Sequence, residues 1–549
     1  MNALISQTLC VDNLSVATAE GRAILQNVSF EIAPGETLCL VGESGSGKSV
    51  TSLATLGLLP GNALNVTGGR ILLGGEDVLR VSAGRLKALR GSRMAMIFQE
   101  PMTALNPVLT VGRQIDEVLQ THTGLGAAER RAQVMNALAQ VHLPDIERVH
   151  DAYPHQLSGG QRQRIMIAMA LVLEPRLLIA DEPTTALDVT TQQQILKLIR
   201  ELQHKHGTAV LFITHDMGVV VDIADRVCVM RQGQVVESGT VEAVLSRPQQ
   251  DYTRALLAAV PDLKPRAARD EAVGARVVLD VSELSKVYPP AGGSWPWLGK
   301  RRAGTHAVQA VSFSLRRGRT LGIVGESGSG KSTVARCVMR LLAPTQGAVR
   351  VTGKDISELS AAGLKPHRKR IQMIFQDPNR SLNPRMSIGK SLIEGPMNHG
   401  VPFAQAWERG QQLLELVGLP ADAIDRYPHQ FSGGQRQRIA IARALAMEPD
   451  VIVADEAVSA LDVSVQAQVL QLLDDIQQRT GVAILFITHD LRVAAQVCDD
   501  VLVMQRGQVV EYGPAGQVLA DPRQTYTRQL MDAVPGKGWN FSTGQRISP

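Results

Sequence analysis

The sequence predicts an α/β protein made of two tandem domains, each built around a parallel β-sheet. Two observations lead to this prediction. Short apolar runs that are typical of buried strands alternate with segments of helical periodicity in both halves of the chain. The stretch Gly-Glu-Ser-Gly-Ser-Gly-Lys-Ser at residues 42–49 also recurs letter for letter at residues 325–332, which is 283 positions later. So long a period indicates duplicated domains, because repeats of about 20–50 residues are what build a solenoid.

The first half of the chain shows the alternation most clearly. The expected strands lie at residues 8–14, 24–32, 37–41, 70–73, 94–98, 177–180 and 209–214. Expected helices begin at residue 50 and cover residues 111–119, 127–140 and 191–203, where apolar residues recur at helical spacing. The helical stretch between residues 98 and 157 interrupts the alternation, so we expect it to form a separate helical subdomain.

Composition limits the possible functions. The chain has 549 residues, 44% of them apolar and 20% charged, as in ordinary globular proteins. A net charge of +5 does not require a nucleic acid partner, and 3% aromatic residues offer few stacking platforms for single strands. The five scattered cysteines form no zinc or iron–sulfur pattern. The longest apolar run, residues 165–173, is far below the ~20 residues that span a bilayer. We therefore expect a soluble chain in a reducing cytoplasm that contacts the membrane only through partners.

The repeated stretch has the context of a phosphate-binding loop, since each copy follows an apolar strand and precedes a helix. Its glycines let backbone N–H groups point at phosphate oxygens, and the helix N-terminus adds positive potential. The lysine would reach the β- and γ-phosphates, and the final serine would ligate Mg²⁺. The alternative is a glycine-rich turn with a chance lysine, which two identical copies in the same context disfavour. The predicted ATP-binding residues are Gly42, Ser44, Gly45, Gly47, Lys48, Ser49, Gly325, Ser327, Gly328, Gly330, Lys331 and Ser332.

Two carboxylates follow a later strand in each half, Asp181-Glu182 and Asp455-Glu456. A strand end beside the phosphate loop is where Mg²⁺ must be held, and the aspartate suits the metal. The glutamate is placed to polarise the water that attacks the γ-phosphate. Alone, such a pair is more often the start of a loop, but it occurs twice, each time with a phosphate loop.

A second repeated motif, Ser-Gly-Gly-Gln-Arg-Gln-Arg, begins a helix in each half. Its first three residues are Ser158, Gly159 and Gly160 in the first copy, and Ser432, Gly433 and Gly434 in the second. Ser-Gly-Gly at a helix start forms a second anion-binding corner. The alternative is an ordinary serine N-cap followed by flexible glycines.

Together these motifs resemble those of ATP-binding cassette (ABC) transporter ATPases, with two cassettes fused in one chain, and the likeness covers nearly all of residues 8–535. The resemblance implies two tandem P-loop NTPase domains, each a RecA-like parallel sheet core with an antiparallel β-subdomain and a helical subdomain. It also implies Mg²⁺ and ATP held between the phosphate loop of one cassette and the Ser-Gly-Gly signature of the other. Lys48 would then share a site with Ser432 and Gly434, and Lys331 with Ser158 and Gly160.

Further residues take their roles from this resemblance. His215 and His489, each after Phe-Ile-Thr, would bond the γ-phosphate and join Glu182 and Glu456 as catalytic residues. Beside Ser49, Ser332, Asp181 and Asp455, the Mg²⁺ ligands would include Gln99 and Gln376, which would also sense the transporter's membrane part. Ala186-Leu-Asp188 and Ala460-Leu-Asp462 would cross the interface between cassettes. Tyr288 would stack on adenine, whereas residues 16–18 of the first half offer no aromatic ring. Both sites keep every catalytic residue, so we expect two competent sites.

The segments after each cassette indicate a branch of the family. Tyr-Thr-Arg at 252–254 and 526–528, each followed by Ala-Val-Pro, resembles the dipeptide, oligopeptide and nickel importer ATPases. The segments at 99–107 and 376–384, which share Leu-Asn-Pro, do so too. Unlike some members, the segment 262–280 has no cysteine, so we expect no metal cluster there. The importer reading implies two permease subunits, a periplasmic or lipid-anchored solute-binding protein, no nucleic acid, and a peripheral position on the cytoplasmic side of the inner membrane.

The expected domain organisation follows from these motifs. The first ATPase domain with its extension covers residues 1–261, a charged linker covers 262–276, the second domain covers 277–535, and residues 536–549 form a flexible tail. The tryptophan-containing loop at 289–304 is a solvent-exposed insertion or a membrane contact. Three functional alternatives stay open: a soluble twin-cassette ATPase acting on ribosomes or nucleic acid, an exporter ATPase, and an importer of nickel or glutathione rather than peptides.

Overall fold

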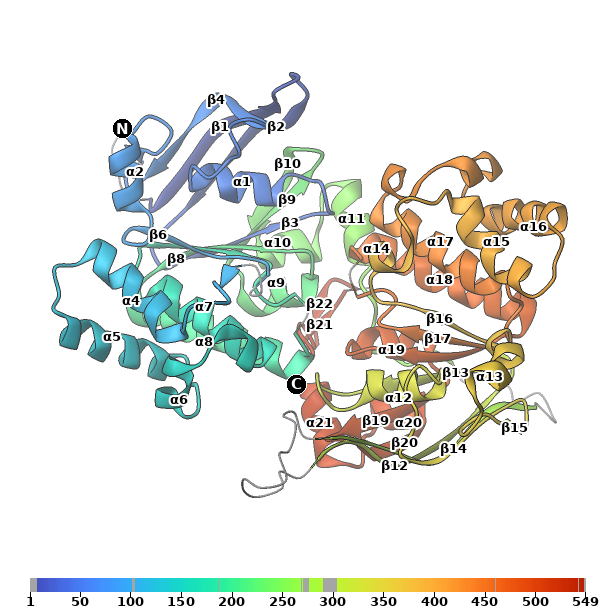
Figure 1. Ribbon diagram of the computed structural model, residues 1–549. Coiled ribbons are helices and arrows are strands. Elements are labelled where there is room, and N and C mark those ends of the chain that lie inside the picture. The colour runs from blue at the N-terminus through green and yellow to red at the C-terminus, as the bar shows by residue number, and fades with distance from the viewer. Residues whose placement is uncertain are drawn as a thin grey trace. The chain divides into compact units, whose positions relative to one another are not determined.

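The computed structural model divides the chain into two compact units. One consists of residues 1–260 together with 535–549, and the other of residues 261–534. The residues that it describes are 7–100, 104–185, 187–267, 269, 276–289, 304–459, 461–541 and 543–547. Each unit combines a six-stranded sheet, a four-stranded sheet and a group of helices (Figure 1). The predicted α/β class and the duplication are therefore confirmed.

The six-stranded sheet is the core of each unit. Its strand order is β10-β9-β3-β8-β7-β6 in the first unit and β16-β17-β18-β13-β19-β20 in the second, and every pair is parallel except the one with the edge hairpin strand, β10 or β20. The strands of the first unit are β3 Thr37–Val41, β6 Met94–Ile97, β7 Leu177–Asp181, β8 Ala209–Thr214, β9 Arg226–Arg231 and β10 Gln234–Thr240. Those of the second unit are β13 Thr320–Val324, β16 Ile371–Ile374, β17 Val451–Asp455, β18 Ala483–Ile487, β19 Asp500–Gln505 and β20 Gln508–Pro514. The central strands are buried on both faces, which explains their continuous apolar sequences.

An antiparallel sheet accompanies each core sheet. Its orders are β2-β1-β4-β5 and β12-β11-β14-β15. The strands are β1 Leu9–Thr18, β2 Ala23–Ile32, β4 Leu64–Leu73, β5 Glu76–Asp77, β11 Val277–Tyr288, β12 Thr305–Arg316, β14 Gln346–Val351 and β15 Lys354–Asp355. The first helix after each phosphate loop, α1 Lys48–Thr55 or α12 Lys331–Val338, lies between this sheet and the core sheet (Figure 1).

The helices expected at 111–119, 127–140 and 191–203 are present as α4, α5 and α8, and the structure adds others. The remaining helices of the first unit are α2 Ala83–Leu89, α4 Val111–His122, α5 Ala127–Gln140, α6 Ile146–Asp151, η2 Pro154–Gln156, α7 Gly159–Leu171, α8 Val189–His206, α9 Met217–Ile223, α10 Val241–Ser246 and α11 Asp251–Ala258. In the second unit they are α13 Ala361–Arg368, α14 Pro378–Ser381, α15 Ile388–Asn398, α16 Phe403–Leu416, η3 Ala421–Asp425, η4 Pro428–Gln430, α17 Gly433–Leu445, α18 Val463–Thr480, α19 Leu491–Val497, α20 Ala515–Ala520 and α21 Thr525–Asp532. Helices α4 to α6 form the predicted helical subdomain, on the side away from the antiparallel sheet (Figure 1). No helix of the described residues is long and apolar enough to cross a membrane.

The expected linker is part of the second unit. Its Arg266 side chain donates to the Asp499 carboxylate at 2.7 Å, and that carboxylate also accepts the Thr320 N–H at 2.7 Å, at the start of β13. Arg269 donates to Gln477 at 2.6 Å and pairs with Asp474. Two arginines of the expected charged linker are therefore paired with carboxylates of the second unit.

The structure differs from the prediction of a flexible tail after residue 535. Trp539 and Phe541 are buried in the core of the first unit, and the Gly536 N–H donates to the Asp222 carboxylate at 3.1 Å. A short hairpin, β21 Trp539–Asn540 and β22 Gln545–Arg546, completes the segment. Its polar and glycine-rich composition concealed two aromatic anchors, whose burial is worth about 1.5–3 kcal/mol for each large apolar side chain.

We predict that Trp539→Ala releases this C-terminal segment, because the indole is its largest buried group. Limited trypsin digestion should then cut at Lys537 and Arg546 at least about tenfold faster than in the wild type, which corresponds to a docking loss of about 1.4 kcal/mol. Ile547→Ala is the matched control, since that side chain is 54% exposed in the same segment. Equal cleavage rates in wild type and Trp539→Ala would contradict the docking of the tail.

Candidate nucleotide site

Each phosphate loop wraps around its own lysine. The Lys48 ammonium donates to the carbonyls of Gly42 at 2.7 Å and Glu43 at 2.9 Å. Lys331 does the same with Gly325 at 2.7 Å and Glu326 at 2.9 Å. The two lysines are only 6% and 5% exposed. A buried ammonium held by neutral carbonyls sits at a site that favours an anion, which agrees with the predicted phosphate contact.

The glycines of the loop are required by its geometry. A Cβ atom on Gly42 would lie 2.2 Å from the Met230 carbonyl oxygen, and one on Gly325 would lie 2.2 Å from that of Met504. Gly47, which precedes α1, has φ 104° and would place a Cβ atom 2.4 Å from the Leu25 side chain. The loop thus packs against strand backbone where no side chain fits, which only glycine allows.

The strand-end carboxylates lie beside the loop serine and two further predicted residues. Ser49 Oγ is 3.3 Å from Asp181 Oδ1, and Ser332 Oγ is 3.3 Å from Asp455 Oδ1. In the first unit Glu182 accepts a hydrogen bond from Gln99 Nε2 at 2.8 Å and lies 3.1 Å from His215 Nδ1.

The second unit repeats this arrangement. Gln376 Nε2 donates to Glu456 Oε2 at 2.7 Å, and His489 Nδ1 lies 3.4 Å from Glu456 Oε1. The structure therefore brings loop, aspartate, glutamate, glutamine and histidine together in each unit. Both glutamates also adopt left-handed backbone, with φ 46° at Glu182 and 48° at Glu456, a strain that is typical of functional positions.

The pKa values of the two carboxylates of each pair are shifted in opposite directions. Burial, followed by the neighbouring glutamate, raises the pKa of Asp181 and of Asp455. Burial also raises the pKa of Glu182, but the hydrogen bond and charge of His215 outweigh it and lower that pKa to about 2. Glu456 is lowered for the same reasons, through His489. The glutamates are therefore ionised at neutral pH, as a base acting on water requires.

A magnesium ion fits the oxygen ligands at this edge of the sheet. Hydroxyl and carboxylate oxygens are its preferred ligands, and Ser49 with Asp181, or Ser332 with Asp455, presents both. Among the described residues, no group of three or more histidine, cysteine, aspartate or glutamate side chains could hold a metal alone. Such an ion would thus share its remaining ligands with phosphate oxygens and water.

The signature motif starts α7 and α17 with reciprocal caps. Ser158 Oγ accepts the Gln161 N–H at 3.3 Å, while the Gln161 side chain accepts the Ser158 N–H at 3.0 Å, and the second copy repeats both distances. Ser158, Gly159, Ser432 and Gly433 are exposed. A Cβ atom on Gly160 would lie 2.8 Å from Thr191, and one on Gly434 would lie 2.3 Å from Val465. The capping alternative is therefore present in the structure, and it leaves the serine and first glycine open to a ligand.

Sequence reasoning missed a tyrosine on each loop. Tyr252 Oη accepts the backbone N–H of Glu43 at 3.2 Å, and Tyr526 Oη accepts that of Glu326 at 3.3 Å. Both belong to the Tyr-Thr-Arg segments, which were read only as marks of a family branch. One observation could have indicated this contact: the tyrosine recurs at the same position of both repeats, as the two identical loops do.

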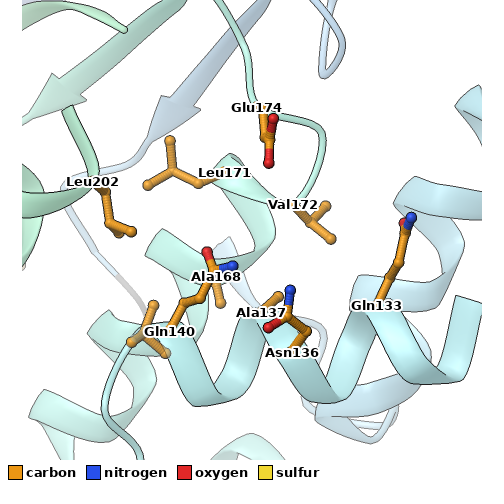
Figure 2. A pocket seen from close by; sticks show the side chains of 10 residues that line it. Gln133, Asn136, Ala137, Gln140, Ala168, Leu171, Val172, Glu174 and Leu202 are labelled. Atoms are coloured by element: carbon orange, nitrogen blue, oxygen red, sulfur yellow. The ribbon is translucent and has the colours of Figure 1, made fainter. Parts of the chain in front are cut away.

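Other predicted positions are less defined. Tyr288 ends β11, with the Lys286 ammonium 5.6 Å from its ring centre. Residues Ala186 and Ala460 and the loop at 290–303 lie outside the described residues, so the expectations for them stay predictions. A cavity of about 110 Å³ among α5, α7 and α8, lined by Gln133, Asn136 and Gln140, holds none of the predicted site residues (Figure 2). Its volume is below the range of ligand pockets, about 300–1,000 Å³.

We predict that His489 makes the stability of the nucleotide-free second unit pH-dependent. Burial lowers the pKa of His489, but Glu456 outweighs this and the pKa is raised. Its stabilising contribution is therefore complete below the unfolded value of about 6.5 and is lost as pH rises through the folded pKa. Urea unfolding should show that His489→Gln destabilises most at pH 6 and least at pH 9. The exposed His429→Gln is the control, and a pH-independent difference at position 489 would contradict the ion pair.

Comparisons with known proteins agree with this geometry. The ABC transporter family model matches residues 25–185 and 308–459, and the model of the oligopeptide/dipeptide transporter C-terminal region matches 236–287 and 510–542. The peptidoglycan transport ATP-binding protein YejF of Agrobacterium fabrum is 49% identical over 96% of both chains. The glutathione import ATP-binding protein GsiA of Escherichia coli K12 is 48% identical over 96% of this chain and 89% of its own. The chain belongs to the ABC transporter family as an ATP-hydrolysing protein with two fused cassettes.

Proposed function

We propose that this protein is the motor subunit of an importer for dipeptides, oligopeptides or related peptide-like solutes. The matched C-terminal region and the two import and transport relatives support this reading of the cargo class. Glutathione, itself a small peptide, falls within the class, and nickel complexes stay the alternative cargo. No observation on the described residues favours the ribosome or nucleic acid alternative.

The observation that carries the proposal is that each unit exposes two large apolar side chains at matching positions of the repeat. Leu58 and Phe98 are 39% and 40% exposed in the first unit, and their counterparts Leu341 and Phe375 are 53% and 39% exposed in the second. Phe98 and Phe375 immediately precede the glutamines that bond the catalytic glutamates. Large apolar side chains at matching exposed positions are typical of a docking surface for a partner helix.

The second unit also forms a groove at this surface. A cavity of about 350 Å³ there is lined by Met339, Leu341, Phe375, Leu392 and Met447, with Arg443 among its polar residues. We assign these surfaces to two permease subunits that carry the membrane-spanning part. The protein would then act peripherally on the cytoplasmic face of the inner membrane, with a solute-binding protein on the other side.

We further propose the roles of the site residues. Glu182 and Glu456 activate the attacking water, and His215 and His489 hold the glutamates and contact the γ-phosphate. Lys48 and Lys331 bind the β- and γ-phosphates, while the loop serines, aspartates and glutamines hold Mg²⁺, which would neutralise phosphate charge. The signature residues Ser158, Gly159, Gly160, Ser432, Gly433 and Gly434 complete the ATP sites, and Tyr288 stacks on adenine. ATP binds the closed pair of cassettes more strongly than the open pair, and this difference in affinity drives their closure and the change of state of the permease.

Purification from membranes tests the proposal. Tagged protein extracted in mild detergent should bring two permease subunits with it, and Phe98→Glu with Phe375→Glu should reduce their recovery at least about tenfold by placing charges on the docking surface. Phe403→Glu, at a side chain that is 56% exposed elsewhere in the second unit, is the matched control. Recovery of ribosomal proteins or DNA without a permease would contradict the importer.

A further inference from the structure

The chain passes between the two units at the same point of each repeat. The division falls between Val260 and Pro261 and again between Val534 and Pro535, which is inside the two Ala-Val-Pro motifs. We call residues 251–267 the first strap and residues 525–541 the second strap. Each strap starts in one unit and ends in the other.

The starting end of each strap is bound to a phosphate loop. Tyr252, in α11, accepts the Glu43 N–H at 3.2 Å, and Tyr526, in α21, accepts the Glu326 N–H at 3.3 Å. These N–H groups belong to the glycine-rich loops whose backbone groups bind phosphate. A change in the loop on nucleotide binding therefore changes the environment of the tyrosine.

The far end of the first strap is bound to α19 of the second unit. Arg492 donates to the Pro261 carbonyl at 3.1 Å, and the Arg266 N–H donates to the Ala495 carbonyl at 2.9 Å. Arg266 also bonds Asp499, whose side chain is 1% exposed, at 2.7 Å. The contact is thus anchored by a buried ion pair.

The far end of the second strap is bound to α9 of the first unit. The chain backbones touch there, since a Cβ atom on Gly218 would lie 2.5 Å from the Pro535 carbonyl oxygen. The Gly536 N–H donates to Asp222 at 3.1 Å, and Trp539 and Phe541 are buried beyond it. Position 218 corresponds to position 492 of the second unit, 274 residues later, so both straps meet the same turn of the same helix.

That helix directly follows the catalytic histidine. Helix α9 begins at Met217, two residues after His215, and α19 begins at Leu491, two residues after His489. We propose that the straps are reciprocal couplers, which transmit occupancy of the phosphate loop in one unit to the helix behind the catalytic histidine in the other. Tyr252 and Tyr526 are positioning residues in this device. The inference goes beyond the transport role and rests only on ATP binding at the two loops.

A coupler requires that nucleotide interact differently with two states of the connected element. The tyrosine connects the nucleotide to the strap because its partner is an N–H group of the loop. The strap is short and contains a proline where it passes to the other unit, so it transmits a displacement of α11 or α21 to that unit. The straps are not equivalent. The Arg231 guanidinium lies 4.9 Å from the centre of the Tyr252 ring, whereas the corresponding position in the second unit is Gln505.

Hydrogen exchange in the full chain tests the second strap. Lys48→Ala with Glu456→Gln confines MgATP to the second loop and prevents its turnover. ATP should then slow hydrogen exchange in α12, next to the occupied loop. It should also slow exchange in α9 of the other unit about fivefold, because fivefold is the lower end of typical coupling between two sites. Gly218→Ala should abolish the change in α9 and keep that in α12, because its methyl group would collide with Pro535.

Two further variants control the test. Gly84→Ala adds the same methyl group to a helix of the first unit where no atom lies within 4 Å, and it should leave the response of α9 intact. Trp539→Ala, which changes a residue of the strap and leaves the sequence of α9 unaltered, should abolish the response as Gly218→Ala does. Protection of α12 without any response in α9, or a response that persists in Gly218→Ala and Trp539→Ala, would overturn the coupling. Absence of protection in α12 would contradict ATP binding itself, and with it the coupling.

Discussion

A buried lysine ammonium, bonded to carbonyl oxygens of its own loop, is the interaction on which each half of this molecule depends. Burying a charge is unfavourable unless hydrogen bonds or an opposite charge compensate it, and the loop carbonyls supply such bonds. We propose that the phosphate of the nucleotide binds next to this ammonium. The surrounding features serve this arrangement: a wholly buried strand before the loop, glycines where strand backbone excludes a side chain, and a helix that starts at the lysine.

The duplicated sites are alike in chemistry but differ in detail. In both units the histidine and glutamine bond the glutamate, and the histidine lowers its pKa beside a neighbouring aspartate. Thr185 adds a third hydrogen bond to the Glu182 carboxylate at 3.0 Å, whereas its counterpart Ser459 bonds the backbone of Glu456 instead. Arg231 beside Tyr252, where the second unit has Gln505, is a further difference between the units.

The sequence predicted the parallel core and the helical subdomain because each depends on local pattern, and the candidate site residues were named from equally local motifs. Strand periodicity, loop glycines and strand-end carboxylates are readable over a few residues. The tyrosine on each loop and the docked tail were not predictable in this way. Glu43 and Tyr252 are 209 positions apart, and Trp539 finds its place in a core built by residues of the other repeat. Such contacts depend on how the chain returns on itself, and the polar composition around Trp539 pointed to a frayed end.

Two complete ATP sites in this protein are the central expectation, and the most direct test is ATPase turnover in the permease complex after one base is removed at a time. Because a lost general base costs about 10²–10⁴ in rate at its own site, Glu182→Gln and Glu456→Gln should each lower total turnover by at least about half. The exposed Glu174→Gln controls for the amide substitution in the first unit. Turnover that is unchanged by either substitution would show that only one site works and would contradict the account.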